Sequence, residues 1–229
     1  MKHIHLVGGE KGGVGKSVMS RLLSQFCLDN QHPFIALDAD QSHATLSRSY
    51  GDFARHLNLE EFESADQIIE VAVEEDVTVV IDLPAQSERL LDRWIDENGV
   101  LELCDDLGLK LIIWYVVDDG PDSANLLKKF LDRYDHAVQC IAVKNFGRGS
   151  DFSRIDQCLA DHLNVSVMEL PGLHASTMRK IDNHALSFWA AVNNKEIEGH
   201  LGLMERQRVR VWQKKTFKQI AEQLTQQEI

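Results

Sequence analysis

Short apolar segments alternate along the chain with longer segments in which apolar residues recur every three or four positions. Several of the short segments are continuous runs of Val, Ile and Leu, which is typical of parallel strands covered by helices on both faces. The six predicted strands are residues 3–7, 34–38, 77–82, 109–117, 137–144 and 165–170.

The segments between these strands have the apolar spacing of amphipathic helices. Helices are predicted from Val18 to about Asp29, over residues 88–98 up to Gly99, and over residues 123–134. A strand–helix alternation with right-handed crossovers predicts an α/β fold with a doubly wound, mainly parallel sheet and helices on both faces.

The strand pattern stops after Pro171, and residues 175–193 and 203–224 are predicted as helices. We therefore expect one domain over residues 1–229, with a sheet core at 1–173 and C-terminal helices at 174–229.

Composition narrows the class of protein. The 229 residues are 44% apolar and 26% charged, as in one ordinary globular domain, and contain no apolar run of about 18 residues that could span a bilayer. The N-terminal residues lack the apolar core of a secretory signal, and the four cysteines form no CxxC pair, so a reducing cytoplasm is expected. The net charge of -12 argues against uniform attraction to nucleic acid, although a local basic patch could still bind it.

Residues 9–17 read G-E-K-G-G-V-G-K-S between a predicted strand and a predicted helix. Glycines in this position let successive backbone N–H groups converge on phosphate oxygens, and the following helix adds its positive N-terminal end. Lys16 is expected to reach the β- and γ-phosphates, and the Ser17 hydroxyl to bind Mg²⁺. A simple glycine-rich turn is the alternative. The expected nucleotide-binding residues here are Gly12, Gly13, Val14, Gly15, Lys16, Ser17 and Val18.

The loop departs from the general phosphate-loop pattern at Glu10, where that pattern has glycine. The run K-G-G-V-G-K-S resembles the deviant Walker A motif of ParA/MinD-like ATPases, which have the SIMIBI type of P-loop fold. The resemblance implies an ATP- and Mg²⁺-dependent ATPase that forms a homodimer with ATP, in which Lys11 reaches the partner's nucleotide. A cation supplied in this way neutralises charge that develops during phosphoryl transfer. Taken alone, Lys11 could be a solvated loop lysine.

Acidic residues follow two of the predicted strands. The run T-V-V-I-D at 78–82 has the form of a Walker B strand, and Asp82 is expected to hold Mg²⁺, with residues 83–86 as a loop that senses the γ-phosphate. The run D-A-D-Q at 38–41 is similar to the family's switch I motif. The resemblance implies that Asp40 positions the attacking water and that Asp38 supports the metal. Asp38 could equally cap the next helix.

Two segments are candidates for nucleobase recognition. Asn145 closes the fifth predicted strand, where family members often place an asparagine that reads the base, and Pro171 and Leu173 lie in the family's second base-contacting segment. A guanine reader of the NKxD type would need an aspartate at position 148, where the chain has Arg148, so adenine is favoured. Plain turn chemistry is the alternative for both segments.

A basic stretch stands out near the C-terminus. Between residues 206 and 218 there is no acidic residue, and six are basic: Arg206, Arg208, Arg210, Lys214, Lys215 and Lys218. The stretch could be the solvated face of a helix, a surface for non-specific contact with the DNA backbone, or a membrane-surface helix. The last is the weakest, because the apolar face is thin and the chain ends in polar residues.

Residues 82–87 and 145–152 look like those of ParA-like ATPases of conjugative and mobilisable plasmids, the StbB, MobD and TraL types. The resemblance covers residues 1–173. It implies a slow ATPase whose ATP-bound dimer engages DNA, an adaptor or a DNA-binding partner protein, in plasmid partition or transfer, with a nucleoid-associated cytoplasmic location. Two alternatives remain at this point: an ATP-dependent metabolic synthetase on the same fold, and a nucleotide-gated scaffold with little hydrolysis.

Overall fold

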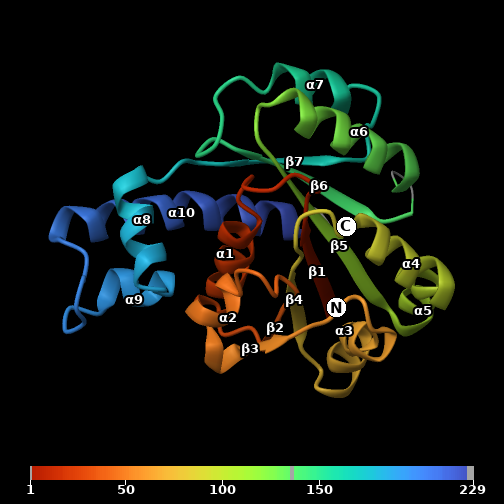
Figure 1. Ribbon diagram of the computed structural model, residues 1–229, viewed down its shortest axis with the longest axis horizontal. Helices are drawn as coiled ribbons and strands as arrows, with labels where there is room; N and C mark the ends of the chain where they lie inside the picture. Colours follow the sequence, from red (N-terminus) through yellow and green to blue (C-terminus); the bar gives the residue numbers. More distant parts are fainter. Residues whose placement is uncertain (1, 135–136, 226–229) are drawn as a thin grey trace.

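One parallel sheet of seven strands organises the computed structural model, which describes residues 2–134 and 137–225 (Figure 1). The strand order is β3-β2-β4-β1-β5-β6-β7, and every neighbouring pair is parallel. The expected doubly wound α/β fold is confirmed. The strands are β1 (Lys2–Gly8), β2 (Phe34–Asp38), β3 (Ala54–His56), β4 (Thr78–Asp82), β5 (Leu109–Val117), β6 (Gln139–Asn145) and β7 (Ser166–Leu170).

Helices cover both faces of the sheet and enclose two separate apolar cores. In β5, Leu111, Ile113 and Tyr115 face one core, while Ile112 and Trp114 face the other. This alternation explains the continuous apolar runs, because both faces of each central strand are buried.

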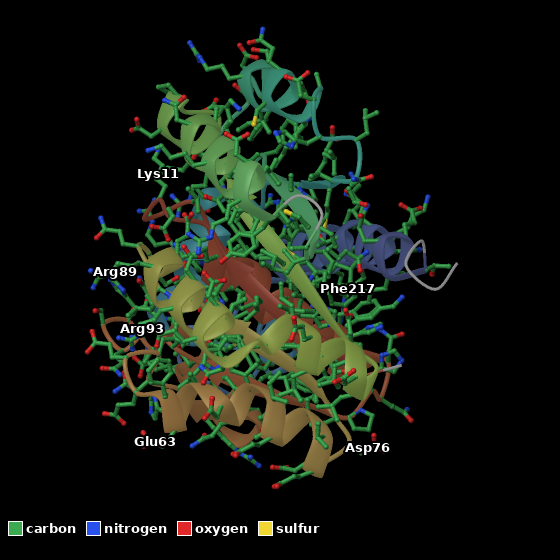
Figure 2. All side chains as sticks on the ribbon, turned by 90° about the vertical axis from the view of Figure 1, so that its right-hand side faces the viewer. Lys11, Glu63, Asp76, Arg89, Arg93 and Phe217 are labelled. Atoms are coloured by element: carbon green, nitrogen blue, oxygen red, sulfur yellow. The ribbon has the colours of Figure 1, made fainter. Side chains whose placement is uncertain are left out.

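The helices divide between the two faces as a doubly wound sheet requires. Figure 2 looks onto the face covered by α3 (Phe62–Glu74), α4 (Glu88–Asn98), α5 (Val100–Leu107), α6 (Pro121–Tyr134) and α7 (Ser153–Leu159). The other face carries α1 (Lys16–Asp29), α2 (Thr45–Ser49), α8 (Ala175–Asn183), α9 (Phe188–Asn193) and α10 (Leu203–Thr225), and the 3₁₀ turn η1 (Gly51–Phe53) follows α2.

The single helix expected over residues 175–193 is wrong, since the segment forms α8 and α9 with a break between them. Ala185 adopts a left-handed backbone conformation in the break, with φ of 47°. Ser187 then caps α9 by accepting a hydrogen bond of 3.1 Å from the Ala190 N–H. The apolar spacing continues across the break because both helices pack on the same core.

The strand expected over residues 137–144 begins two residues later, at Gln139. Ala137 and Val138 instead close the turn after α6, because both N–H groups donate to the carbonyl of Tyr134, at 2.9 and 3.2 Å.

Helix α10 covers the outer edge of β7, as Figure 1 shows. The Gln219 side chain accepts from the Glu169 N–H at 2.9 Å and donates to the Glu169 carbonyl at 2.7 Å, so it pairs with the strand as a neighbouring backbone would. Gln223 adds a hydrogen bond of 3.2 Å to the Val167 carbonyl. The helix therefore protects an edge that could otherwise pair with another chain.

In the described part of the chain, no helix combines the length and the apolar character needed to cross a membrane.

Candidate nucleotide-binding site

The glycine-rich loop connects β1 to α1 at the carboxyl edge of the sheet, as the sequence predicts. Its conformation requires glycine, because Gly9, Gly13 and Gly15 have φ angles of 135°, 76° and 108°. A Cβ atom at position 9 would lie 2.6 Å from the carbonyl oxygen of Val116 on the neighbouring strand β5. The loop is thus packed against the sheet where a phosphate loop would be.

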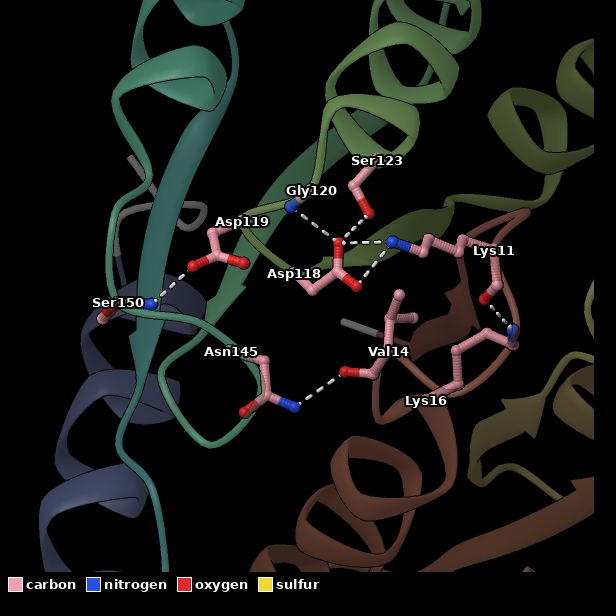
Figure 3. A network of polar contacts seen from close by, with 9 residues as sticks. All are labelled: Lys11, Val14, Lys16, Asp118, Asp119, Gly120, Ser123, Asn145 and Ser150. Carbon is pink, nitrogen blue, oxygen red and sulfur yellow. Dashed lines mark hydrogen bonds and ion pairs between the residues drawn. The ribbon is translucent and has the colours of Figure 1, made fainter.

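The Lys16 side chain curls back into the loop that precedes it. Its Nζ donates to the Gly9 carbonyl at 2.8 Å and to the Lys11 carbonyl at 3.1 Å, and the residue is only 8% exposed. Burial lowers the pKa of Lys16, and the nearby carboxylates of Asp82, Glu10 and Asp40 act in the opposite direction. A donor group is therefore already held at the centre of the loop (Figure 3).

Asn145, at the end of β6, holds the phosphate loop from outside. Its Nδ2 donates to the Val14 carbonyl at 2.7 Å, and its Oδ1 accepts from the Gly147 N–H at 2.9 Å. Both ends of the amide therefore have partners within the chain. Figure 3 shows the bond to Val14. The contact with Gly147 is the turn chemistry expected as the alternative to base recognition, whereas the contact with Val14 supports the phosphate loop.

Lys11 forms an ion pair rather than extending freely into solvent. Its Nζ lies 3.0 and 2.7 Å from the two carboxylate oxygens of Asp118, which follows β5. The Ser123 hydroxyl and the Gly120 N–H also donate to Asp118, at 2.6 and 3.0 Å (Figure 3). Partial burial opposes ionisation, but these donors hold the pKa of Asp118 below its ordinary value.

Asp82 and Asp38 are register partners on the adjacent strands β4 and β2. Asp82 is fully buried, and within the described structure neither of its carboxylate oxygens has a hydrogen-bond partner. Burial, with repulsion from Asp38, raises the pKa of Asp82 to about 7, although the nearby hydroxyls of Ser17 and Ser20 act in the opposite direction. A buried carboxylate without a partner fits a cation-binding position, because a cation compensates its lost hydration.

Asp38 and Asp40, at the end of β2 and just after it, accept hydrogen bonds from the backbone. Asp38 accepts from the Asp40 N–H at 3.2 Å and from the Ser47 N–H in α2 at 2.8 Å, so it does cap the next helix. Asp40 accepts from the N–H groups of Ser42 and His43, at 3.1 and 3.2 Å. These contacts fix the switch-like loop between β2 and α2.

Two adjoining clefts lie along this edge, with volumes of about 510 and 320 Å³. Val18, Arg148 and Asp182 line both clefts, so the two adjoin. The predicted residues in the larger cleft are Gly12, Gly13, Gly15, Lys16, Ser17 and Asp40, and those in the smaller cleft are Asn145, Pro171 and Leu173. Lys11, Val14, Asp38 and Asp82 are not among the residues that line either cleft.

The sequence interpretation missed Arg21, which also lines the larger cleft. Arg21 is only 2% exposed, and it donates to the Ser17 carbonyl at 3.0 Å and to Asp182 at 2.8 Å. Its spacing of four residues from Ser17 places both on one side of α1, and this was the available signal.

The basic residues of α10 lie outside the larger cleft. Arg208 and Lys215 line a third groove of about 350 Å³, which adjoins the smaller cleft at residues 171–173 and Trp212. The other four recur every fourth residue, so in a continuous helix they form one row: Arg206, Arg210, Lys214 and Lys218.

Comparisons with known proteins place this site in context. No protein-family model matches the chain. The chain is 25% identical to Protein TraL of Escherichia coli, over 96% of this chain and 98% of that protein. It is 26% identical to Protein MobD of Acidithiobacillus ferrooxidans, over 66% of this chain and 67% of that protein.

Among solved structures, the MinC:MinD cell division complex of Aquifex aeolicus has a chain with a TM-score of 0.56 at 12% identity, covering 94% of this chain and 95% of that one. The signal recognition particle receptor FtsY of Elizabethkingia anophelis gives a TM-score of 0.54 at 14% identity, over 93% of this chain and 65% of that one. These comparisons confirm the resemblance seen in the sequence: the chain is similar in sequence to TraL and MobD, and it shares the fold of the MinD and FtsY structures.

Proposed function

We propose that the protein is an Mg²⁺-dependent ATPase whose ATP-bound homodimer acts in the transfer or partition of plasmid DNA. The observation that carries the proposal is the pair of adjoining clefts at the carboxyl edge of the sheet. One cleft is lined by the phosphate loop and Lys16, and the other by Asn145 and residues 171–173. This edge is where open α/β sheets bind nucleotides.

Each residue of the loop has a defined part in this proposal. The N–H groups of residues 12–17 and the Lys16 ammonium bind phosphate oxygens, and Lys16 exchanges its two carbonyl partners for them. Ser17 and Asp82 would hold Mg²⁺, with Asp38 beside them, and the ion would neutralise phosphate charge. Asp40 orients the attacking water from the loop after β2, and Asn145, Pro171 and Leu173 line the base end.

Lys11 is the candidate for a contact across the dimer. In the single chain it pairs with Asp118, so its ammonium is already held beside the phosphate loop. Reaching a partner's nucleotide requires it to leave this ion pair. The phosphate charge of a bound ATP offers a stronger partner than one carboxylate, which favours the exchange only in the ATP-bound dimer.

Asp40→Ala should separate ATP binding from ATP hydrolysis. The variant keeps the phosphate loop and Lys16, so it should bind ATP, but it lacks the proposed water-orienting carboxylate and should lose at least about 100-fold in turnover. An ATP-bound dimer should accumulate, which light scattering after size-exclusion chromatography detects. Hydrolysis at the parental rate would remove Asp40 from the mechanism, and turnover that required a small carboxylate would favour a synthetase.

The names of the relatives TraL and MobD support a role in plasmid transfer. The row of Arg206, Arg210, Lys214 and Lys218 on α10 supports direct contact with DNA. Within the described ranges only Lys218 of this row has an acidic partner, with its Nζ 3.6 Å from Glu222. Four cations on one side of a straight helix suit the DNA backbone, and their contact should depend on salt rather than on sequence.

A variant with glutamine at all four positions of this row should bind a random-sequence DNA duplex at least about tenfold more weakly than the parent. The salt dependence of its binding should also be flatter. The four positions are Arg206, Arg210, Lys214 and Lys218. Fluorescence anisotropy at several salt concentrations measures both effects. A control variant removes the same number of charges at Arg89 of α4 and at Lys128, Lys129 and Arg133 of α6, helices that cover the opposite face of the sheet from α10. Equal losses in the two variants would show that only net charge matters.

A further inference from the structure

Glu10 connects the phosphate loop to the loop and helix that follow β4. Its carboxylate Oε1 accepts a hydrogen bond of 2.8 Å from the N–H of Glu88, the first residue of α4. Its backbone carbonyl accepts a second one, of 3.2 Å, from the Gln86 N–H. One residue of the phosphate loop therefore holds two consecutive points of the segment that enters α4.

Helix α4 has no cap from its own N-terminal residue. Ser87, which occupies the capping position, directs its hydroxyl to the Pro84 carbonyl at 3.0 Å and does not cap the helix. The first N–H groups of a helix have no partners within it, so an acceptor must come from elsewhere. Glu10, 78 positions earlier in the chain, provides that acceptor.

The segment held by Glu10 borders the phosphate cleft. Pro84 and Ala85 line the larger cleft, together with the phosphate loop. The segment is fixed at its other end by the Leu83 N–H, which donates to the Val7 carbonyl at 3.0 Å. Gln86 adopts a left-handed conformation with φ of 60°, so the turn depends on contacts that hold it in place.

The geometry points to Glu10 as a positioning residue, which sets the place of residues 83–87 over the phosphate cleft by capping α4. This inference rests on the proposed ATPase function and adds a residue that the phosphate-loop motif does not specify. Position 10 is where the general motif has glycine, which could not make this side-chain contact.

The hydrogen-bond acceptor of Glu10, rather than its negative charge, is what caps α4 in this inference. The negative charge of Glu10 lies close to the carboxylate of Glu88. Burial and repulsion from Glu10 therefore both raise the pKa of Glu88. Glutamine has the same length as glutamate and keeps a carbonyl acceptor, but it carries no charge. Glu10→Gln and Glu10→Ala therefore remove the same charge, and only Glu10→Ala removes the hydrogen bond to Glu88.

Hydrogen exchange of the protein without nucleotide tests the cap itself. In Glu10→Ala, amides over residues 86–91 should exchange about five to ten times faster than in the parent, because the first turn of α4 loses its acceptor. Glu10→Gln should exchange at close to the parental rate. Equal exchange in the two variants would overturn the proposed cap.

Steady-state hydrolysis and ATP titration test the consequence. Glu10→Ala should lower kcat about five- to tenfold while ATP affinity stays within about threefold, and Glu10→Gln should restore most of kcat. Equal kcat in the two variants would contradict the role of Glu10 and leave the ATPase proposal intact. A parental protein that neither binds nor hydrolyses ATP would contradict the proposed function, and with it this role in turnover.

Discussion

Lys16→Ala is expected to raise the dissociation constant for Mg-ATP at least about 100-fold, which corresponds to about 2.7 kcal/mol. Among the described residues that line the larger cleft, Lys16 carries the only side-chain ammonium, and its Nζ is held between the Gly9 and Lys11 carbonyls. A charged donor that is already oriented and shielded from water binds a phosphate oxygen much more strongly than an exposed lysine does. Isothermal titration calorimetry measures the loss directly.

A matched variant distinguishes this effect from a general change in charge. Lys195→Ala removes one positive charge at an exposed position outside both clefts and should leave ATP affinity within about twofold of the parent. Thermal melting should show that Lys16→Ala is folded. Its free energy of unfolding should be about 1–3 kcal/mol lower than that of the parent, because two carbonyls lose their donor. Unchanged ATP affinity in folded Lys16→Ala would contradict the proposed role of the loop.

Gly15→Ala is expected to lower the free energy of unfolding by about 2–4 kcal/mol and to weaken ATP binding at the same time. Gly15 has a φ angle of 108°, and a Cβ atom there would lie 2.3 Å from the Asn145 Nδ2. The methyl group would displace the amide that donates to the Val14 carbonyl at 2.7 Å. The substitution should therefore disturb both the backbone conformation of the phosphate loop and the hydrogen bond from Asn145 that holds the loop in place.

Gly12→Ala is the control for the stability measurement. A Cβ atom at Gly12 meets nothing within 4 Å, and the backbone there is not left-handed. Its unfolding free energy should stay within about 0.5 kcal/mol of the parent in denaturant titrations. Equal destabilisation by the two substitutions would mean that Asn145 does not support the loop as the structure shows.

The sheet core was predictable because its strands are long apolar runs and its phosphate loop is defined by residue order. Strands β1, β2, β4 and β5 lie within a residue or two of the predicted segments. Strand β3 was missed, since it has only three residues, two of them charged or imidazole side chains exposed at the sheet edge. Whether such a short strand forms depends on its pairing with the neighbouring strand β2 rather than on its own sequence pattern.

Helix α3 was also missed, although its signal was present. Ala65, Ile68 and Ile69 recur with helical spacing and are buried against the sheet. Helix α5 begins directly after Gly99, which the pattern correctly marked as the end of α4. A left-handed glycine that ends one helix can thus also begin the next.

The sequence predicts candidate site residues but not their contacts. Residue order singles out the glycine-rich loop, its two lysines and the aspartates as candidates, because phosphate binding requires these types at fixed spacing. Contacts such as Lys11 with Asp118 and Glu10 with Glu88 join residues 107 and 78 positions apart. They depend on strand order, which brings β1 beside both β4 and β5.

A crystal structure with Mg²⁺ and a non-hydrolysable ATP analogue tests the nucleotide site most directly. We expect the triphosphate within hydrogen-bond distance of the N–H groups of residues 12–17 and of the Lys16 ammonium, and the metal ion beside Ser17 and Asp82. The base should lie toward Asn145 and residues 171–173. A glycine-rich loop that stays empty at saturating analogue, or a nucleotide bound at another edge of the sheet, would contradict the proposed function.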